Sequence, residues 1–273
     1  VCRMWTEQDA PGLALRGEAA LPRNHLLRSL PERDLERLMP SLQRVALTPR
    51  RVLQHAGVPI EHVYFIEDGL VSVLVNTDEG SAVEAWLIGR EGAVGTAALL
   101  GVRTSPLRHF VQIGGSALRL RVDDVNRAME EMPQFKAAMH NYVHATLVQS
   151  SQSAACSLSH TLLQRLARWL LTAQDRSARD ELPVTQDLRA RSLGVRRATV
   201  SEALKPLVQQ RIFARERGLI RILDRARLEQ IACRCYRLMR GRRDKAEQSG
   251  NGRNRLYALS AFCALLEIEL LVQ

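Results

Sequence analysis

The sequence predicts an α+β chain in which a small β-barrel precedes a long helix and a basic helical domain. Short runs of β-branched and aromatic residues, separated by turn residues, fill the region from about residue 45 to 122. From residue 133 the apolar residues recur at steps of three and four, which indicates helices. Nearly all of the excess positive charge lies in residues 183–240, which hold 14 Lys/Arg against 5 Asp/Glu. These observations divide the chain into a β-rich N-terminal part and a basic, helical C-terminal part.

Composition and charge exclude several classes of protein. The chain has 273 residues, of which 46% are hydrophobic, and is long enough for two domains with buried cores. No apolar run reaches the ~20 residues that span a bilayer, because Glu267 and Glu269 interrupt the apolar tail. Arg3, Glu7 and Asp9 break up the region where a signal peptide would be apolar. We therefore expect a cytoplasmic protein with no membrane partner, whose five scattered cysteines are reduced.

The N-terminal part reads as an all-β barrel or jelly roll. It follows a loose arm of residues 1–23 and a short helix from Pro31 to Leu38. The strand-like runs recur at roughly 8–12 residues, which is typical of such folds. Pairs such as Asp68-Gly69 and Gly114-Gly115 mark the expected turns. The expected strands are Val52–Leu53, Val63–Ile66, Val71–Val75, Val83–Ile88, His109–Ile113 and Ala117–Val122.

Helices follow the barrel. A short helix is expected from Asp123 to Glu131, a long one from Pro133 to about Ala154, and a third from Leu158 to about Ala173. The long helix carries two apolar stripes, which predicts one contact with the barrel and one with a second copy of the chain. The alternative is a helix packed on both faces inside its own domain. The residues assigned to the dimer contact are Met139, Val143, Leu147, Ser150 and Ala154.

From residue 185 the spacing of residues is that of a helix-turn-helix. Ala190 is small enough for two helices to cross closely, and Gly194 can take the left-handed conformation that ends the first helix. Val200 can then anchor the second helix in the core. This pattern is weak alone, but a hairpin follows it at residues 212–223 and the segment is strongly basic. Together these features predict a winged helix-turn-helix.

The outer face of the second helix would read duplex DNA in the major groove. Pro206 lacks an amide hydrogen and is expected to kink or shorten this helix after Lys205. The alternative explanation is that the positive charge marks only a solvated face. The predicted base-reading residues are Arg197, Ala198, Ser201, Glu202 and Lys205. The predicted phosphate contacts are Thr185, Arg196, Thr199, Arg215, Arg217 and Arg221.

The order of these elements over residues 24–240 resembles the Crp/Fnr family of bacterial transcription regulators. The segments that carry the resemblance are 63–71, 165–171, 182–186, 193–200 and 221–225. The resemblance implies a double-stranded β-helix (jelly-roll) sensor domain at 24–132, a dimerisation helix at 133–156 and a DNA-binding domain at 157–240. The tail at 241–273 has no assigned role. A homodimer on a near-palindromic operator, with RNA polymerase as a further partner, is also implied.

The resemblance also implies which residues would read DNA and which would hold an effector. Arg197 matches the family's guanine-reading Arg, whereas Ala198 and Glu202 replace its usual Glu and second Arg, so a different half-site is expected. Relatives that bind cyclic nucleotides use a Gly-Glu pair and a phosphate-binding Arg. Here Thr96 replaces that Glu, so cyclic AMP is not expected to bind and the effector is unknown or absent. The degenerate pocket would consist of Gly95, Thr96, Ala97, Arg103, Arg108, Ser150 and Ser151.

No catalytic, metal or cofactor site is expected. The chain has no Gly-x-Ser-x-Gly, phosphate-loop or HExxH motif, so we do not expect an enzyme. The pairs His140/His144 and Cys156/His160 have metal-ligand spacing, but no third ligand is evident for either. Cys233 and Cys235 could form a thiol-disulfide switch, although incidental thiols are the expectation, and an iron–sulfur cluster would need four ligands.

A second class of function competes with DNA binding. The barrel could sense a ligand and the helix-turn-helix could contact a protein partner instead of DNA. The two functions differ in their response to salt, because counterion release weakens DNA binding by orders of magnitude as salt rises. A protein-partner module would not take up duplex DNA at low salt.

Overall fold

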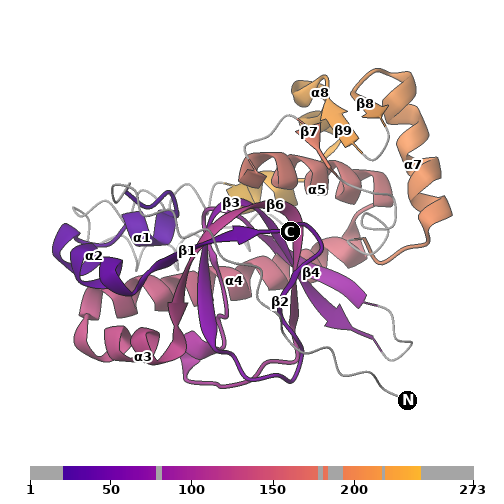
Figure 1. The fold of residues 1–273 in the computed structure, drawn as a ribbon. Helices are drawn as coiled ribbons and strands as arrows, with labels where there is room; N and C mark the ends of the chain where they lie inside the picture. The colour runs from indigo at the N-terminus through magenta and orange to yellow at the C-terminus, as the bar shows by residue number, and fades with distance from the viewer. Residues whose placement is uncertain (1–20, 78–81, 178–180, 184–192, 217–218, 241–273) are drawn as a thin grey trace, which may run out of the picture.

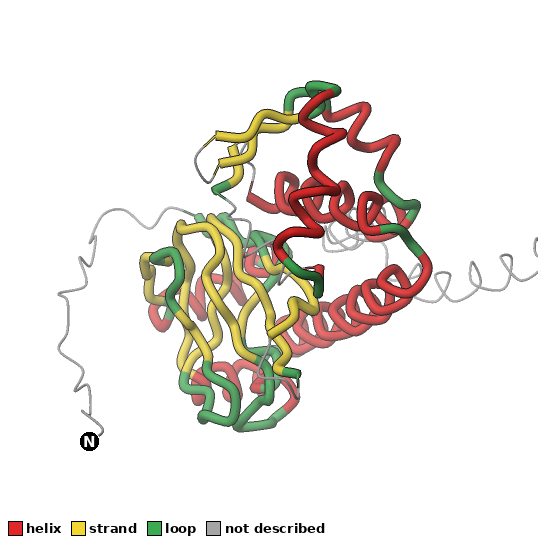
Figure 2. Tube along the Cα trace, turned by 90° about the vertical axis from the view of Figure 1, so that its right-hand side faces the viewer, coloured by secondary structure: helices red, strands yellow, loops and turns green. Residues whose placement is uncertain are grey.

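The computed structural model describes residues 21–77, 82–177, 181–183, 193–216 and 219–240. A β-barrel occupies the N-terminal part, and a body of helices with a small sheet forms the C-terminal part (Figure 1). The two parts form separate lobes when seen from the side (Figure 2). Among the described residues, no helix combines the length and the apolar content needed to span a bilayer.

The barrel is a six-stranded antiparallel sheet. Its main path runs β1 (Gln43–Leu47), β6 (Arg108–Arg121), β3 (His62–Asn76) and β4 (Ala82–Ile88). Two short strands complete it, because β2 (Val52–Gln54) pairs with β6 and β5 (Ala93–Val94) pairs with β3. Val, Ile, Leu and Phe side chains of β3 fill the interior, and most of that strand is buried. The predicted β-rich domain is therefore confirmed.

Two strands are much longer than the sequence predicts. β3 and β6 run without interruption through Asp68-Gly69 and Gly114-Gly115, so the predicted turns at these pairs are wrong. The glycines instead permit a close approach of the two strands. A Cβ on Gly69 would lie 2.5 Å from the Ile113 carbonyl oxygen, and one on Gly115 would lie 2.3 Å from that of Asp68. The register of the pairing also shifts here, which bends both strands.

Short helices surround the barrel. Asn24 caps α1 (His25–Arg28) by accepting from two backbone amides, and its Nδ2 donates to the backbone oxygens of Ile66 and Gly92. This buried side chain therefore fixes the start of the described chain to the barrel. The predicted helix near Pro31 is α2 (Glu32–Leu38), followed by η1 (Met39–Ser41). η2 (Ala98–Leu100) and α3 (Val122–Glu131) lie against each other beside the barrel.

The long helix α4 (Pro133–Ser159) packs its first half against the barrel. Phe135 and Met139 are fully buried in the barrel core, and half-buried Val143 packs beside them. Met139 therefore lies away from the face that a second copy of the chain could contact. In contrast, Leu147 is 63% exposed. The helix ends at Ser159, later than predicted, because the backbone of His160 is extended.

In the part of the chain that the structure describes, the C-terminal lobe contains helices and a three-stranded sheet. Its helices include α5 (Leu162–Ser177), α7 (Arg197–Gln209), α8 (Arg225–Ile231) and a helical stretch at residues 235–240. The sheet has the order β7 (Glu181–Leu182), β9 (Leu219–Ile222) and β8 (Phe213–Glu216). One hydrophobic core joins these elements and also includes Leu70, Leu87 and Ile113 of the barrel. The two lobes therefore share buried apolar contacts.

We predict that Gly115→Ala destabilises the protein by about 1–3 kcal/mol, since its methyl group would overlap the Asp68 carbonyl. The melting temperature should fall by roughly 2–10 °C in a thermal-unfolding measurement. Ser116→Ala, one residue further along the same strand, is the control, because it adds no atom. Equal melting temperatures for the two variants would contradict the close approach.

Candidate nucleic-acid interface

The turn before α7 has the backbone that the sequence predicts. Gly194 has φ +64°, the left-handed conformation that follows the end of a helix. Arg196 is extended and α7 begins at Arg197. Val200 is fully buried, and Leu204 and Leu207 continue the inner face at 1% exposure each. The first helix of the motif, including Ala190, lies outside the described residues.

The opposite face of α7 is open to solvent. Ala198, Glu202 and Lys205 are exposed, and Ser201 is half-buried. The Nζ of Lys205 lies 2.7 Å from Oε1 of Glu202, so these two predicted base-reading residues form an ion pair one turn apart. Arg197 stands at the first position of the helix, and its side chain lies outside the described part of the chain. The side of α7 that is predicted to read DNA therefore faces solvent, and the opposite side packs into the hydrophobic core.

Pro206 does not end the helix, so the predicted shortening is wrong. α7 continues for three residues past it to Gln209. The proline removes one hydrogen bond, but the residues on either side hold the helix in place by burial, since Leu204 and Leu207 both lie in the core. Tertiary packing therefore outweighs the local penalty.

The residues predicted to contact phosphates are spread over the turn, α7 and the hairpin. Arg196 and Thr199 are exposed at the start of α7. Arg221 on β9 is exposed too, but its Nε donates to Oε1 of Glu181 on β7 at 2.9 Å, so it already has a carboxylate partner. Of the other predicted residues, Arg215 lies on β8, but its side chain is outside the described part of the chain. Thr185 and Arg217 lie outside the described residues.

The residues predicted to form the effector pocket occupy several segments. Gly95, Thr96 and Ala97 precede η2, and Gly95 has φ +96°. Arg103 is exposed and Arg108 is half-buried at the start of β6. On α4, Ser150 is half-buried, whereas exposed Ser151 donates to the Leu147 carbonyl of its own helix. In the described part of the chain, no hydrogen bond or ion pair joins one of these seven residues to another.

Tyr142 of α4 fills the space between that helix and this side of the barrel. The Tyr142 hydroxyl donates to the Ala93 carbonyl at 2.8 Å. A Cβ on Gly92 would lie 2.6 Å from the same hydroxyl oxygen, so a glycine is needed there. Burial raises the pKa of Tyr142, which stays neutral. This contact closes part of the surface where an effector would meet α4.

Polar contacts that the sequence did not reveal join α5 to the barrel. The indole Nε1 of Trp169 donates to Oε1 of Glu84 at 2.7 Å. Arg176 is 8% exposed, lies 2.9 Å from Oε1 of Glu91 and donates to the Leu87 carbonyl. Their partners are 85 or more residues away in sequence, so no local pattern could have shown them.

The structure also corrects the expectation for the cysteines. Cys156 and His160 do have further potential ligands, because Cys233 and Cys235 lie beside them. These residues come from two segments about 75 residues apart, and only the tertiary fold brings them together.

Comparisons with known proteins agree with this geometry. Residues 164–231 match the Crp-like helix-turn-helix domain. FixK2 from Bradyrhizobium japonicum is similar in structure, with 18% identity and a TM-score of 0.61 over 70% of this chain and 98% of that one. The c-di-GMP-responsive global regulator CLP from Xanthomonas campestris has 16% identity and a TM-score of 0.60 over 70% and 99%. A CRP-family regulator from Thermus thermophilus has 21% identity and a TM-score of 0.58 over 68% and 95%.

No curated protein sequence matches the chain. The solved structures share its fold, and the family match covers the segment that contains α5, α7 and the hairpin. The chain therefore carries a Crp-like helix-turn-helix on the fold of the Crp/Fnr regulators. This confirms the resemblance in the fold and in the DNA-binding domain.

Proposed function

We propose that this chain is a sequence-specific transcription regulator of the Crp/Fnr type, which binds duplex DNA through α7. The observation that carries the proposal is the solvent-exposed outer face of α7. This helix lies in a segment of net charge +9, residues 183–240, which overlaps the Crp-like helix-turn-helix match over residues 164–231. Positive charge supplies affinity for the phosphate backbone, and a helix of this kind fits the major groove. Like the regulators it resembles, the protein acts without catalysis, and it would contact RNA polymerase.

A homodimer through α4 is the second part of the proposal. An exposed stripe runs along the helix at steps of three and four residues, and it consists of small, apolar and imidazole side chains. Its members are Ala137, His140, His144, Leu147, Ser151, Ala154 and Leu158. Such a seam suits a second, identical helix, since short side chains allow close packing. Two copies of α7 related by a twofold axis would read a near-palindromic operator.

The operator is best found by selecting bound sequences from random duplex DNA, followed by titration at several salt concentrations. Affinity for the selected sequence should fall steeply as salt rises. Failure to bind any duplex at low salt would overturn the proposal and favour a module that acts through protein partners.

We predict that Arg197→Ala removes sequence-specific binding and leaves the dimer intact. Loss of a bidentate contact to guanine costs about 1–3 kcal/mol for each half-site, measured as operator affinity against affinity for unrelated duplex. Arg33→Ala is the matched control, because it removes the same charge from an exposed site on α2. Operator affinity of Arg197→Ala equal to that of the control would contradict the assignment of α7.

Leu147→Asp should convert the dimer to a monomer, because it places a carboxylate in the centre of the exposed α4 stripe. Light scattering coupled to size exclusion gives the mass directly. Val102→Asp is the control, since Val102 is 49% exposed on a barrel loop and should leave the mass unchanged. A dimeric Leu147→Asp would place the interface elsewhere.

Cyclic AMP is predicted not to bind, because Thr96 offers no carboxylate to the ribose hydroxyls. Millimolar nucleotide should therefore leave the melting temperature unchanged. A ligand that bound the folded state tightly would raise it, and such a rise would restore the barrel as a nucleotide sensor.

A further inference from the structure

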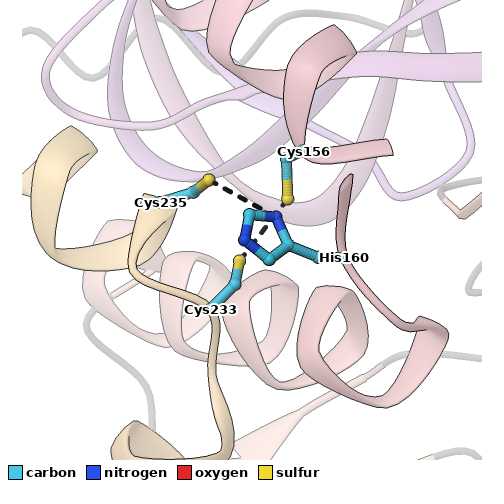
Figure 3. Close-up of side chains that lie close together, drawn as sticks. All are labelled: Cys156, His160, Cys233 and Cys235. Carbon is cyan, nitrogen blue, oxygen red and sulfur yellow. Dashed lines mark hydrogen bonds between the residues drawn. The ribbon is translucent and has the colours of Figure 1, made fainter. Parts of the chain in front are cut away.

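Three cysteines and a histidine converge where the long helix ends. Cys156 lies in the last turn of α4, His160 follows that helix directly, and Cys233 and Cys235 follow α8 (Figure 3). Their sulfur and nitrogen ligand atoms all lie within 4.8 Å of one another. The three thiols are buried and the imidazole is half-buried. Figure 3 shows that the side chains point toward a common centre.

We propose that Cys156, His160, Cys233 and Cys235 bind a single zinc ion with tetrahedral coordination. The proposed function does not include this site, and the site does not depend on that function. Three thiolates and one imidazole are a known ligand set for structural zinc, with four protein ligands and no open position. A zinc ion there would link α4 to the end of the DNA-binding lobe.

The distances fit one ion. With zinc–sulfur bonds of about 2.3 Å and zinc–nitrogen bonds of about 2.0 Å, tetrahedral geometry separates two sulfurs by about 3.8 Å and a sulfur from a nitrogen by about 3.5 Å. The sulfurs of Cys156 and Cys233 lie 3.4 Å apart, and the sulfur of Cys235 lies 3.8 Å from Nδ1 of His160. A four-iron cluster binds each thiolate to a different iron, which would hold the ligands further apart.

The ligand chemistry selects the class of metal. Thiolate and imidazole ligands suit zinc and other borderline or soft ions, whereas calcium and magnesium need oxygen ligands, and the cluster contains none. Packing alone gives a weaker explanation, because a buried thiol is satisfied by any apolar neighbour and needs no second thiol or imidazole.

The surroundings fit a bound metal. Nε2 of Gln152 donates to the sulfur of Cys235 at 3.2 Å, the kind of outer contact that orients a metal ligand. Zinc with three thiolates and a neutral imidazole carries one net negative charge, and positive residues stand close by. Arg168 interacts electrostatically with Cys156. The thiols of Cys156 and Cys233 in turn act electrostatically on Arg165.

The proposed ion would act on the position of the DNA reader. It would join α4 to the chain after α8, across the break at His160 that separates α4 from α5. Arg165 adds a second link from this region, since its Nη2 donates to the Leu193 carbonyl at 2.7 Å, directly before the turn of the helix-turn-helix. Loss of zinc would therefore loosen the DNA-binding lobe at the joint with the long helix.

The test is the metal content of the full chain, produced without a polyhistidine tag and measured by mass spectrometry of the elements. We expect about one zinc per chain. After removal of zinc by a chelator, Co²⁺ added alone should give the absorption of a tetrahedral site, with thiolate-to-cobalt charge transfer. Cys235→Ser and His160→Ala should lose most of the zinc. His55→Ala is the control, because His55 is an exposed histidine of the barrel, outside both the cluster and the proposed dimer stripe.

A ligand variant could fail to fold, so Gln152→Leu provides a second measure. It keeps all four ligands and should weaken zinc affinity about 10- to 100-fold. Iron with acid-labile sulfide, a Cys156–Cys233 disulfide in the freshly purified chain, or unchanged zinc in Cys235→Ser would each overturn the proposal. A chain that is purified without zinc, takes up neither Zn²⁺ nor Co²⁺ and still binds its operator would overturn this inference and leave the proposed function intact.

Discussion

A buried guanidinium joins three parts of the molecule. Arg176 comes from α5, forms an ion pair with Glu91 and donates to the Leu87 carbonyl, both in the barrel, and also donates to Oε1 of Gln149 on α4. A buried charge is tolerated only where its partners are all in place, because removing one leaves the others without compensation. The position of the DNA-binding lobe therefore depends on this contact, with the Trp169–Glu84 hydrogen bond beside it.

Because of this contact, the C-terminal lobe packs directly against the barrel. The core that holds α7 also includes Leu70 and Leu87 of the barrel strands. The turn before α7 lies close to the barrel edge, since a Cβ on Gly194 would be 3.6 Å from Val83 of β4. The segment that leads into α7 therefore lies next to β4. Among the described residues, no hydrogen bond or ion pair links the residues suggested for the effector pocket to the C-terminal lobe, and Tyr142 fills part of the surroundings of that pocket.

Features fixed by local physics were predictable from the sequence, and features fixed by tertiary contacts were not. The left-handed turn at Gly194 and the buried anchors of α7 follow from residue type and spacing. The glycine pairs in the barrel misled the prediction, because a glycine that ends a strand and one that lets two strands touch look the same in sequence. Pro206 led to the prediction of a shortened helix, but the packing of its neighbours keeps α7 helical past this residue.

The two candidate sites also differ in whether local sequence or tertiary contacts determine them. The solvent face of α7 was predictable because it needs only one helix. The cysteine cluster was not, because Cys156 and Cys233 are 77 positions apart in the sequence and meet only in the folded chain. The sequence offered one usable signal, namely two short ligand pairs, Cys-x3-His before α5 and Cys-x-Cys after α8.

The burial of Arg176 has a consequence for how such a chain can change in evolution or in the laboratory. Regulators with exchangeable parts allow a DNA-binding module to be joined to a new sensor at the linker between them. Here a fusion made at residue 157 would carry Trp169 and Arg176 away from Glu84 and Glu91, and would leave acidic groups facing a foreign surface. A fusion therefore has to keep α5 together with β4 and the loop after it.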